Sequence, residues 1–182
     1  PKVAVVDSPS QTETNVKLQG TLQNSDNLEK GNYVIVTLHR PSNVDQENEL
    51  VLLLKGIDEL VGDKKIIFPI HPRTKAILGA TKLDFKNIIM VDPQGYLNFM
   101  YLIKNSFAVI TDSGGISEET TVLGIPCFTM RTTTERPETI EIGTNNLVGI
   151  SIENLTLEYT KFLKNGLSKR GIPELWDGKA SE

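Results

Sequence analysis

The residues with the clearest chemical potential stand at a corner between an apolar run and a helical pattern. The stretch DSGG, residues 112–115, follows the apolar run 107–111 and precedes a helical pattern that contains Glu119. Glycines at such a corner let backbone N–H groups approach a ligand, and the first turn of a helix leaves N–H donors unpaired at the positive end of its dipole. Phosphate is the ligand that this corner is suited to bind.

Two side chains near this corner extend the hypothesis. Ser113 stands where it can cap the helix and offer its hydroxyl to the same oxygens. Glu119 lies further along the helix, where its carboxylate could accept hydrogen bonds from both hydroxyls of a ribose. The neighbouring Glu118 is interpreted as solvated or as an acid favoured by the helix dipole. The alternative is an ordinary capped helix whose glycines serve close packing, and a Gly-Gly pair alone does not decide between the two.

Both histidines of the chain also follow apolar runs. His39 precedes Arg40, and His71 is followed by Arg73 two positions later. Histidine and arginine side chains both donate hydrogen bonds to phosphate oxygens. Each histidine taken alone could be a polar loop residue whose hydrogen bonds are made by its neighbours. Two histidines that both follow strands, and so lie at the same edge of a sheet, favour an anionic ligand.

These residues can meet only if the elements that carry them alternate regularly. Apolar, β-branched runs predict six strands, and amphipathic patterns between them predict helices at 45–62, 72–80, 96–106 and 117–124. The alternation predicts an α/β fold with a Rossmann-like parallel sheet and helices on both faces. In such sheets ligands bind beyond the carboxyl ends of the strands. The strands are expected at 33–38, 65–70, 87–91, 107–111, 126–130 and 147–150.

Length and composition narrow the function classes. The 182 residues suffice for one domain, which we place at 31–182, after a polar lead-in segment or interdomain linker region at 1–30. Scattered basic residues and a net charge of -4 argue against nucleic acid as a partner. No apolar run is long enough to span a membrane, so we expect no membrane partner. The single cysteine, Cys127, excludes an intramolecular disulfide and favours a cytoplasmic location.

The sequence carries no pattern for a metal or a cofactor. The Walker-type and Gly-x-Gly-x-x-Gly patterns are missing, and the histidines have no acidic partner at metal-ligand spacing. We therefore expect neither a metal nor a cofactor. The chain starts at Pro1 rather than at a methionine and ends at Glu182 without an obvious closing element, so we also expect a piece of a longer protein.

At this point the motifs resemble a known family, the non-hydrolysing UDP-N-acetylglucosamine 2-epimerases. Its members have two Rossmann-like halves in the glycosyltransferase-B arrangement, with the active site between them. The resemblance extends from residue 33 to the end and implies that this chain is the carboxyl-terminal half. The family's acidic catalytic residues belong to the amino-terminal half, which this chain lacks. The stretches that carry the resemblance are VTLHRPSNVD, PIHPRT, DPQGYLNFMYLIKNSFAVITDSGGISEET, LGIPCFTMRTTTERPETIEIGTNNLVG and GIPELWDGKASE.

The resemblance implies a role for the corner and for a nearby arginine. Ser113, Gly114 and Gly115 would hold the diphosphate of the substrate, and Glu119 would hold the ribose. Arg136, in the stretch TERPE, would contact the nucleotide phosphates.

The resemblance also implies roles for residues at other strand ends. Gln94 and Phe99 would line the uracil pocket, and His39 would reach the reacting region as a catalytic residue. Arg40 and His71 are further candidates for substrate binding.

The implied reaction inverts carbon 2 of UDP-N-acetylglucosamine to give UDP-N-acetylmannosamine, by elimination of UDP and its re-addition. The implied partners are UDP-N-acetylglucosamine, UDP and the missing half of the enzyme, and the sequence leaves a homodimer open. Alternatives are an epimerase of another UDP-N-acetylhexosamine derivative, a hydrolysing relative, a nucleotide-sugar binding module without catalysis, or half of a glycosyltransferase.

Overall fold

A computed structural model describes residues 28–78 and 84–176. The expected lead-in segment 1–30 lies outside these ranges except for its last three residues. Within the described ranges, no helix combines the length and the apolar character that a membrane crossing requires.

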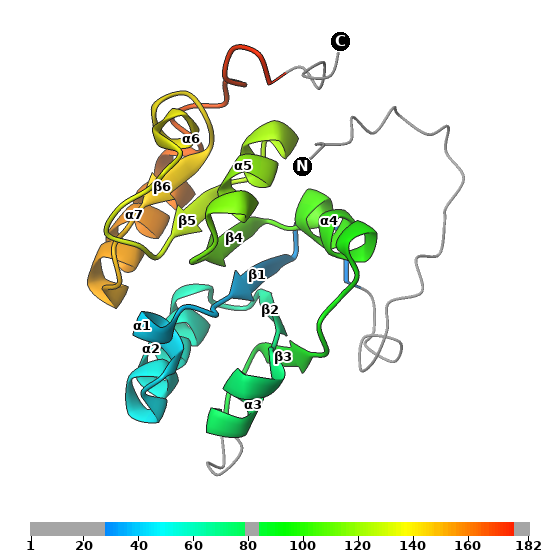
Figure 1. The fold of residues 1–182 in the computed structure, drawn as a ribbon, viewed down its shortest axis with the longest axis vertical. Helices are drawn as coiled ribbons and strands as arrows, with labels where there is room; N and C mark the ends of the chain where they lie inside the picture. Colours follow the sequence, from blue (N-terminus) through cyan, green and yellow to red (C-terminus); the bar gives the residue numbers. More distant parts are fainter. Residues whose placement is uncertain (1–27, 79–83, 177–182) are drawn as a thin grey trace.

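In the described ranges, a six-stranded parallel sheet forms the centre of the fold (Figure 1). Its strand order is β3-β2-β1-β4-β5-β6, so β1 and β4 lie side by side in the middle. The predicted Rossmann-like parallel sheet is confirmed. The strands are β1 Tyr33–Thr37, β2 Lys65–Pro69, β3 Ile88–Val91, β4 Ala108–Thr111, β5 Cys127–Thr129 and β6 Asn145–Leu147.

The central strands β1 and β4 are apolar up to their final threonines because both faces of the sheet are covered. On β1, Val34 and Val36 face one apolar cluster, whereas Tyr33 and Ile35 face the other. This division follows from the two-residue repeat of a strand, which turns successive side chains to opposite faces. A continuous apolar run of this kind is what the sequence showed.

Helices cover both faces of the sheet, as predicted (Figure 1). Buried residues of α2 and α7 join the apolar cluster on one face, and buried residues of α4 join the cluster on the other, where side chains of α5 pack against it. The helices are α1 Pro41–Val44, α2 Glu47–Leu60, α3 Pro72–Leu78, α4 Tyr96–Asn105, α5 Gly114–Leu123, α6 Pro137–Glu141 and α7 Ile152–Asn165.

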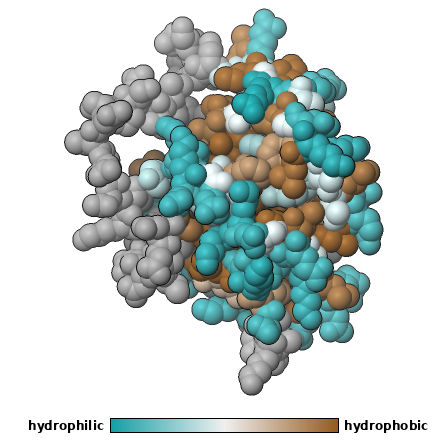
Figure 2. All heavy atoms as spheres, turned by 180° about the vertical axis from the view of Figure 1, so that it is seen from behind, coloured by the Kyte–Doolittle hydropathy of each residue, from teal (hydrophilic) through white to brown (hydrophobic). Residues whose placement is uncertain are grey.

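Apolar side chains also reach the surface of several helices. Leu52 of α2, Leu97 of α4 and Leu157 of α7 are each more than half exposed. Figure 2 shows one face of the molecule, on which apolar and polar side chains lie next to one another.

Some elements differ from those that the sequence predicts. The last strand was expected at 147–150 and is found at Asn145–Leu147. The shift has a physical cause, because Asn145 is buried and its side chain accepts a hydrogen bond from Thr129 Oγ1 at 2.6 Å and donates one to Thr139 Oγ1 at 3.1 Å. A polar residue therefore begins this strand, and an apolar pattern could not locate it.

Three helices were not predicted. The longest, α7, begins after Ser151, whose hydroxyl accepts a capping hydrogen bond from the backbone N–H of Asn154. It crosses close to α2, since a Cβ on Gly56 would lie 2.5 Å from Ile152 Cγ1. The other two, α1 and α6, have four and five residues, too few to show a helical repeat.

Candidate functional site

The candidate site lies where the order of the strands reverses direction. From β1 the chain proceeds outward to β2 and β3, and from β4 it proceeds outward on the other side to β5 and β6. In doubly wound sheets the crevice at this switch point, beyond the carboxyl ends of the strands, is the usual place for a ligand. Thr37 and Thr111 end the two central strands, and their hydroxyl oxygens lie 2.7 Å apart.

Asp112, the first residue after β4, organises the loop that follows β1. Its side chain is fully buried, and its Oδ2 accepts hydrogen bonds from the backbone N–H of His39 at 3.0 Å and of Arg40 at 2.9 Å. Asn43 Nδ2 donates to the same oxygen at 2.9 Å. A buried carboxylate needs such donors, and here they come from residues far away in the sequence. The two central loops are thereby fixed to each other.

His39 is held by the other oxygen of the same carboxylate. Its Nδ1 lies 2.7 Å from Asp112 Oδ1, and the His39 side chain is 56% exposed. The ring is thus anchored on its inner nitrogen. Arg40 lies against the same corner, because its Nε donates to the Asp112 carbonyl oxygen at 3.1 Å.

The two glycines of the corner form the first turn of α5, which begins at Gly114 rather than at the predicted Ser117. Neither glycine has a positive φ. A Cβ on Gly115 would meet only Ser113 Oγ at 4.0 Å, and one on Gly114 would be in ordinary contact with Arg131 Nη1 at 3.4 Å. Among the described residues, neither turn geometry nor packing therefore demands glycine here, although glycine costs about 1 kcal/mol relative to alanine inside a helix.

Ser113 occupies the N-cap position of α5, but its side chain makes no capping hydrogen bond. The expected N-cap position of Ser113 is therefore confirmed, whereas a capping hydrogen bond from its hydroxyl is not formed. Its backbone N–H instead donates to Thr111 Oγ1 at 3.0 Å, which turns the chain sharply out of the strand.

Arg131 and Glu135 form an ion pair beside Gly114, and the sequence did not identify either residue. Arg131 follows β5, and its side chain is only 7% exposed. Its Nη2 and Nη1 donate to the two carboxylate oxygens of Glu135 at 2.7 and 3.2 Å, which is the bidentate geometry that arginine also offers to phosphate. The hydrogen bond with Arg131, followed by its charge, lowers the pKa of Glu135. A carboxylate thus lies next to the glycine corner.

Arg136 lies at the start of α6 and contacts α5. Its Nε donates to Glu118 Oε1 at 2.6 Å, with both side chains partly exposed. Glu118 is therefore paired with an arginine rather than simply solvated. Exposed pairs of this kind contribute about 0–1 kcal/mol to stability, so Arg136 can exchange this carboxylate for another anion at low cost.

Glu119 connects α5 to the start of α4. Burial raises the pKa of Glu119 above its ordinary value, the charge of Glu118 raises it further, and a hydrogen bond with Tyr96 opposes the shift. Tyr96 is the first residue of α4 and is about half exposed. Glu119 thus lies at the junction of two helix starts, on the side of the sheet that α4 and α5 cover.

The two residues expected to line the uracil pocket, Gln94 and Phe99, lie near the start of α4. Gln94 lies in the loop before α4, and its Nε2 donates to the Asp92 carbonyl oxygen at 2.7 Å. Phe99, one turn into α4, is partly buried and packs against the apolar cluster below that helix. The structure thus places Gln94 and Phe99 on either side of the start of α4.

His71 lies further from the corner. It follows β2, the neighbour of β1, and its Nδ1 accepts a hydrogen bond from the backbone N–H of Arg73 at 3.3 Å. Arg73 itself is paired with Asp45 at 2.8 Å, just beyond α1. These contacts connect His71 to its own loop rather than to the corner at Asp112.

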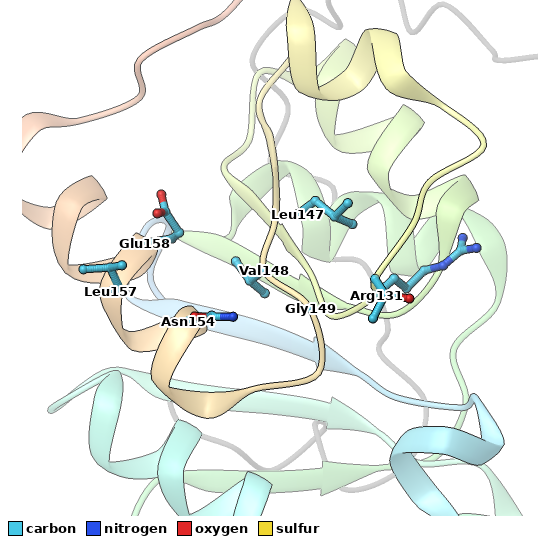
Figure 3. Close-up of a pocket in the computed structure, with 8 residues that line it drawn as sticks. Arg131, Leu147, Val148, Gly149, Asn154, Leu157 and Glu158 are labelled. Atoms are coloured by element: carbon cyan, nitrogen blue, oxygen red, sulfur yellow. The ribbon is translucent and has the colours of Figure 1, made fainter.

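A pocket of about 290 Å³ lies between β6 and the start of α7 (Figure 3). Leu147, Val148 and Leu157 contribute apolar walls, and the backbone of Gly149 is held by a hydrogen bond to the Arg131 carbonyl oxygen at 3.1 Å. Figure 3 shows the Arg131 side chain pointing away from the other lining residues. This pocket is therefore separate from the glycine corner, although the two share Arg131.

Comparisons with known proteins identify relatives of this chain by sequence and by structure. A UDP-N-acetylglucosamine 2-epimerase from Methanocaldococcus jannaschii is 47% identical over 130 residues, which cover 68% of this chain and 36% of that protein. A crystal structure of the M. jannaschii enzyme in complex with UDP-GlcNAc and UDP superimposes with a TM-score of 0.69 and 40% identity, covering 82% of this chain and 44% of that one. The chain thus spans less than half the length of these relatives.

A further relative carries a different substrate in its name. The UDP-2,3-diacetamido-2,3-dideoxy-D-glucuronate 2-epimerase of Pseudomonas aeruginosa is 36% identical over 118 residues, which cover 64% of this chain and 33% of that protein. The family model described as UDP-N-acetylglucosamine 2-epimerase matches residues 3–182, nearly the whole chain. This chain belongs to the UDP-N-acetylglucosamine 2-epimerase family.

Proposed function

We propose that the protein to which this chain belongs interconverts UDP-N-acetylglucosamine and UDP-N-acetylmannosamine, and that this chain binds the UDP part of the substrate. The observation that carries the proposal is the pair Gly114 and Gly115 at the start of α5, which the described structure does not require for its own packing. The relative whose crystal structure is titled as a complex with UDP-GlcNAc and UDP supports the choice of ligand.

The corner suits the departure of UDP from carbon 1 of the sugar. Elimination places negative charge on the leaving phosphate, and a preorganised donor at such a position contributes about 2.7–4 kcal/mol to transition-state stabilisation. The donors would be the backbone N–H groups of Gly114 and Gly115 and the hydroxyl of Ser113. Arg136 would add a positive charge by exchanging Glu118 for the phosphate.

The remaining residues would bind the nucleoside and act at the reacting region. Glu119 would accept hydrogen bonds from the ribose hydroxyls, and Gln94 and Phe99 would border the uracil. His39 would act as an acid-base group, supported by its exposed position on the buried Asp112. Arg40 would border the phosphates, supported by its contact with the same corner.

His71 would bind substrate only at the edge of the site, because the hydrogen bond that its Nδ1 accepts comes from Arg73 in its own loop. The cytoplasmic location and the division of the chain at residues 30 and 31 stay predictions, and a homodimer stays open.

An epimerase of another UDP-acetamido sugar is the second candidate. The P. aeruginosa relative supports it. All the binding residues proposed here except His39 serve the UDP part, which both substrates share. Product analysis of the full-length protein decides between the candidates: NMR should show UDP-N-acetylmannosamine forming from UDP-N-acetylglucosamine. Turnover of the diacetamido glucuronate substrate alone would instead establish the second candidate, and release of free N-acetylmannosamine would indicate hydrolysis.

A further inference from the structure

We infer that Asp112 is a positioning residue that fixes the tautomer of His39, with the proton on Nδ1, so that Nε2 is the nitrogen that exchanges protons with the ligand. The catalytic consequence rests on the proposed function, whereas the tautomer itself does not.

The geometry at Asp112 assigns separate tasks to its two carboxylate oxygens. Oδ2 accepts from the backbone N–H groups of His39 and Arg40 and from Asn43 Nδ2, at 2.9–3.0 Å. Oδ1 lies 2.7 Å from His39 Nδ1, its shortest recorded contact, with a longer one of 3.3 Å to the His39 backbone N–H. Oδ1 is therefore the oxygen that faces the imidazole, and Oδ2 is the oxygen on which the loop donors converge.

The tautomer of the neutral His39 ring follows from this contact. An ionised carboxylate can only accept hydrogen bonds, so the imidazole nitrogen that faces it must carry a proton. In a neutral imidazole the other nitrogen then has a free lone pair, because the bond made by one ring nitrogen determines the state of the other. That nitrogen, Nε2, is on the side of the ring away from the buried carboxylate, and the His39 side chain is 56% exposed.

Replacement of Asp112 by asparagine should reverse this assignment. The loop still needs an acceptor where Oδ2 lies, because three N–H donors converge there. The amide oxygen would take that place, and the amide NH₂ would then face His39 Nδ1 as a donor. Nδ1 must then accept, and the proton moves to Nε2. The variant keeps the shape of the loop and changes the nitrogen that carries the proton.

The first experiment is NMR of the 182-residue chain with ¹⁵N-labelled histidine. The chain has two histidines, so His71 serves as an internal reference. We expect the Nδ1–H tautomer for His39 in the unmodified chain, the Nε2–H tautomer in Asp112→Asn, and no change at His71. Asn43→Ala is the matched control, because it removes one partner of Oδ2 and leaves the imidazole contact, so His39 should keep its Nδ1–H tautomer. An Nε2–H tautomer in the unmodified chain overturns the inference, and this result does not depend on whether any variant folds.

The second experiment is steady-state kinetics of the full-length enzyme. Asp112→Asn should lower kcat by about the factor of 10²–10⁴ typical of a positioned acid-base group, with KM nearly unchanged. His39→Gln should lower kcat similarly, and the double variant should lose little more, because the two residues act as a unit. A raised KM with kcat preserved would show that Asp112 only shapes the binding loop. Absence of epimerisation in the unmodified enzyme would instead refute the proposed function and leave the NMR result intact.

Discussion

At the scale of single residues, the site is built from contacts between loops that the sequence keeps far apart. Asp112 holds His39 and Arg40 from another strand end, and Arg131 reaches Gly114 from a third. Two further pairs, Arg131 with Glu135 and Arg136 with Glu118, lie beside this corner. The result is a rim on which a carboxylate, that of Glu135, already lies beside the glycine corner.

The role of Gly115 can be tested directly. Because a Cβ at this position would meet only Ser113 Oγ at 4.0 Å, Gly115→Val should leave the fold intact. Valine also has a higher helix propensity than glycine, so thermal stability should not fall. The branched side chain would nevertheless cover the N–H donors of the first turn, and UDP affinity measured by calorimetry should fall at least about tenfold, which corresponds to about 1.4 kcal/mol.

The matched control for this variant is Thr156→Val on the exposed face of α7, which should leave both stability and UDP affinity unchanged. Unfolding of Gly115→Val, seen by circular dichroism, would show that packing is the reason for the glycine. Unchanged UDP affinity would remove the diphosphate from this corner.

Residue types and strand ends predict part of this site. His39 and the glycines could be proposed because they follow apolar runs. Asp112 was not chosen as a functional residue, since an acid next to Ser-Gly-Gly is compatible with an ordinary turn. Arg131 was not chosen because nothing local predicts that an arginine is buried, and its burial depends on Glu135 and on the approach of α5. The Asp112 contacts join residues more than 70 positions apart, and the Arg131–Glu135 pair is local but lies outside any helix or strand, so no periodic sequence pattern signals either of them.

At the scale of elements, the sheet was the most predictable part of the fold. Its strands are buried on both faces, so each appears as a continuous apolar run. The sequence pattern does not predict the helix α7, although Leu155 and Tyr159 mark its buried face. Three of its first five residues are polar, so the apolar stripe is short and becomes recognisable only where the helix packs against α2. The strand β6 was misplaced because its buried first residue is an asparagine.

The junction of α4 and α5 leads to a prediction about pH. The raised pKa of Glu119 means that the folded chain holds this proton at pH values above the ordinary 4.5 at which the unfolded chain loses it. Stability from this group is therefore greatest at low pH and falls as the pH rises from 4.5 toward the raised pKa. Glu119→Gln should remove this part of the pH dependence in thermal unfolding experiments.

UDP affinity should depend on the same Glu119 proton, but it should rise with pH where stability falls. If the Glu119 carboxylate accepts from the ribose hydroxyls, only the ionised form binds well, and UDP affinity should rise as the pH passes the raised pKa. At neutral pH, Glu119→Gln should weaken UDP binding by about 10- to 100-fold, the effect of losing hydrogen bonds to a charged group of about 1.5–3 kcal/mol. A 2′,3′-dideoxy analogue of UDP should show no such pH dependence. If the analogue and UDP behave alike, Glu119 does not bind the ribose.

At the scale of the whole molecule, the site is open on the side away from the sheet. His39 is 56% exposed, Glu135 66% and Arg136 46%. Side chains this exposed can contact a phosphate, but they leave water free to reach a reacting sugar. Closure of an active site is what excludes that water. The chain also spans about a third of the length of the curated relatives it matches. The remainder of the protein is therefore expected to cover this rim.

The chain alone should bind UDP but should not epimerise UDP-N-acetylglucosamine. On the proposed role of the glycine corner and its donors, calorimetry should show that UDP binds much better than uridine, which lacks the phosphates. Turnover also needs an acid and a base within hydrogen-bond reach of carbon 2 and a closed cleft, which an exposed rim does not provide. An NMR assay should therefore show no UDP-N-acetylmannosamine from the 182-residue chain, and turnover should appear when the remainder of the protein is added as a separate polypeptide. Measurable epimerisation by the chain alone would contradict this division of labour, and equal affinities for UDP and uridine would contradict the phosphate site on which it depends.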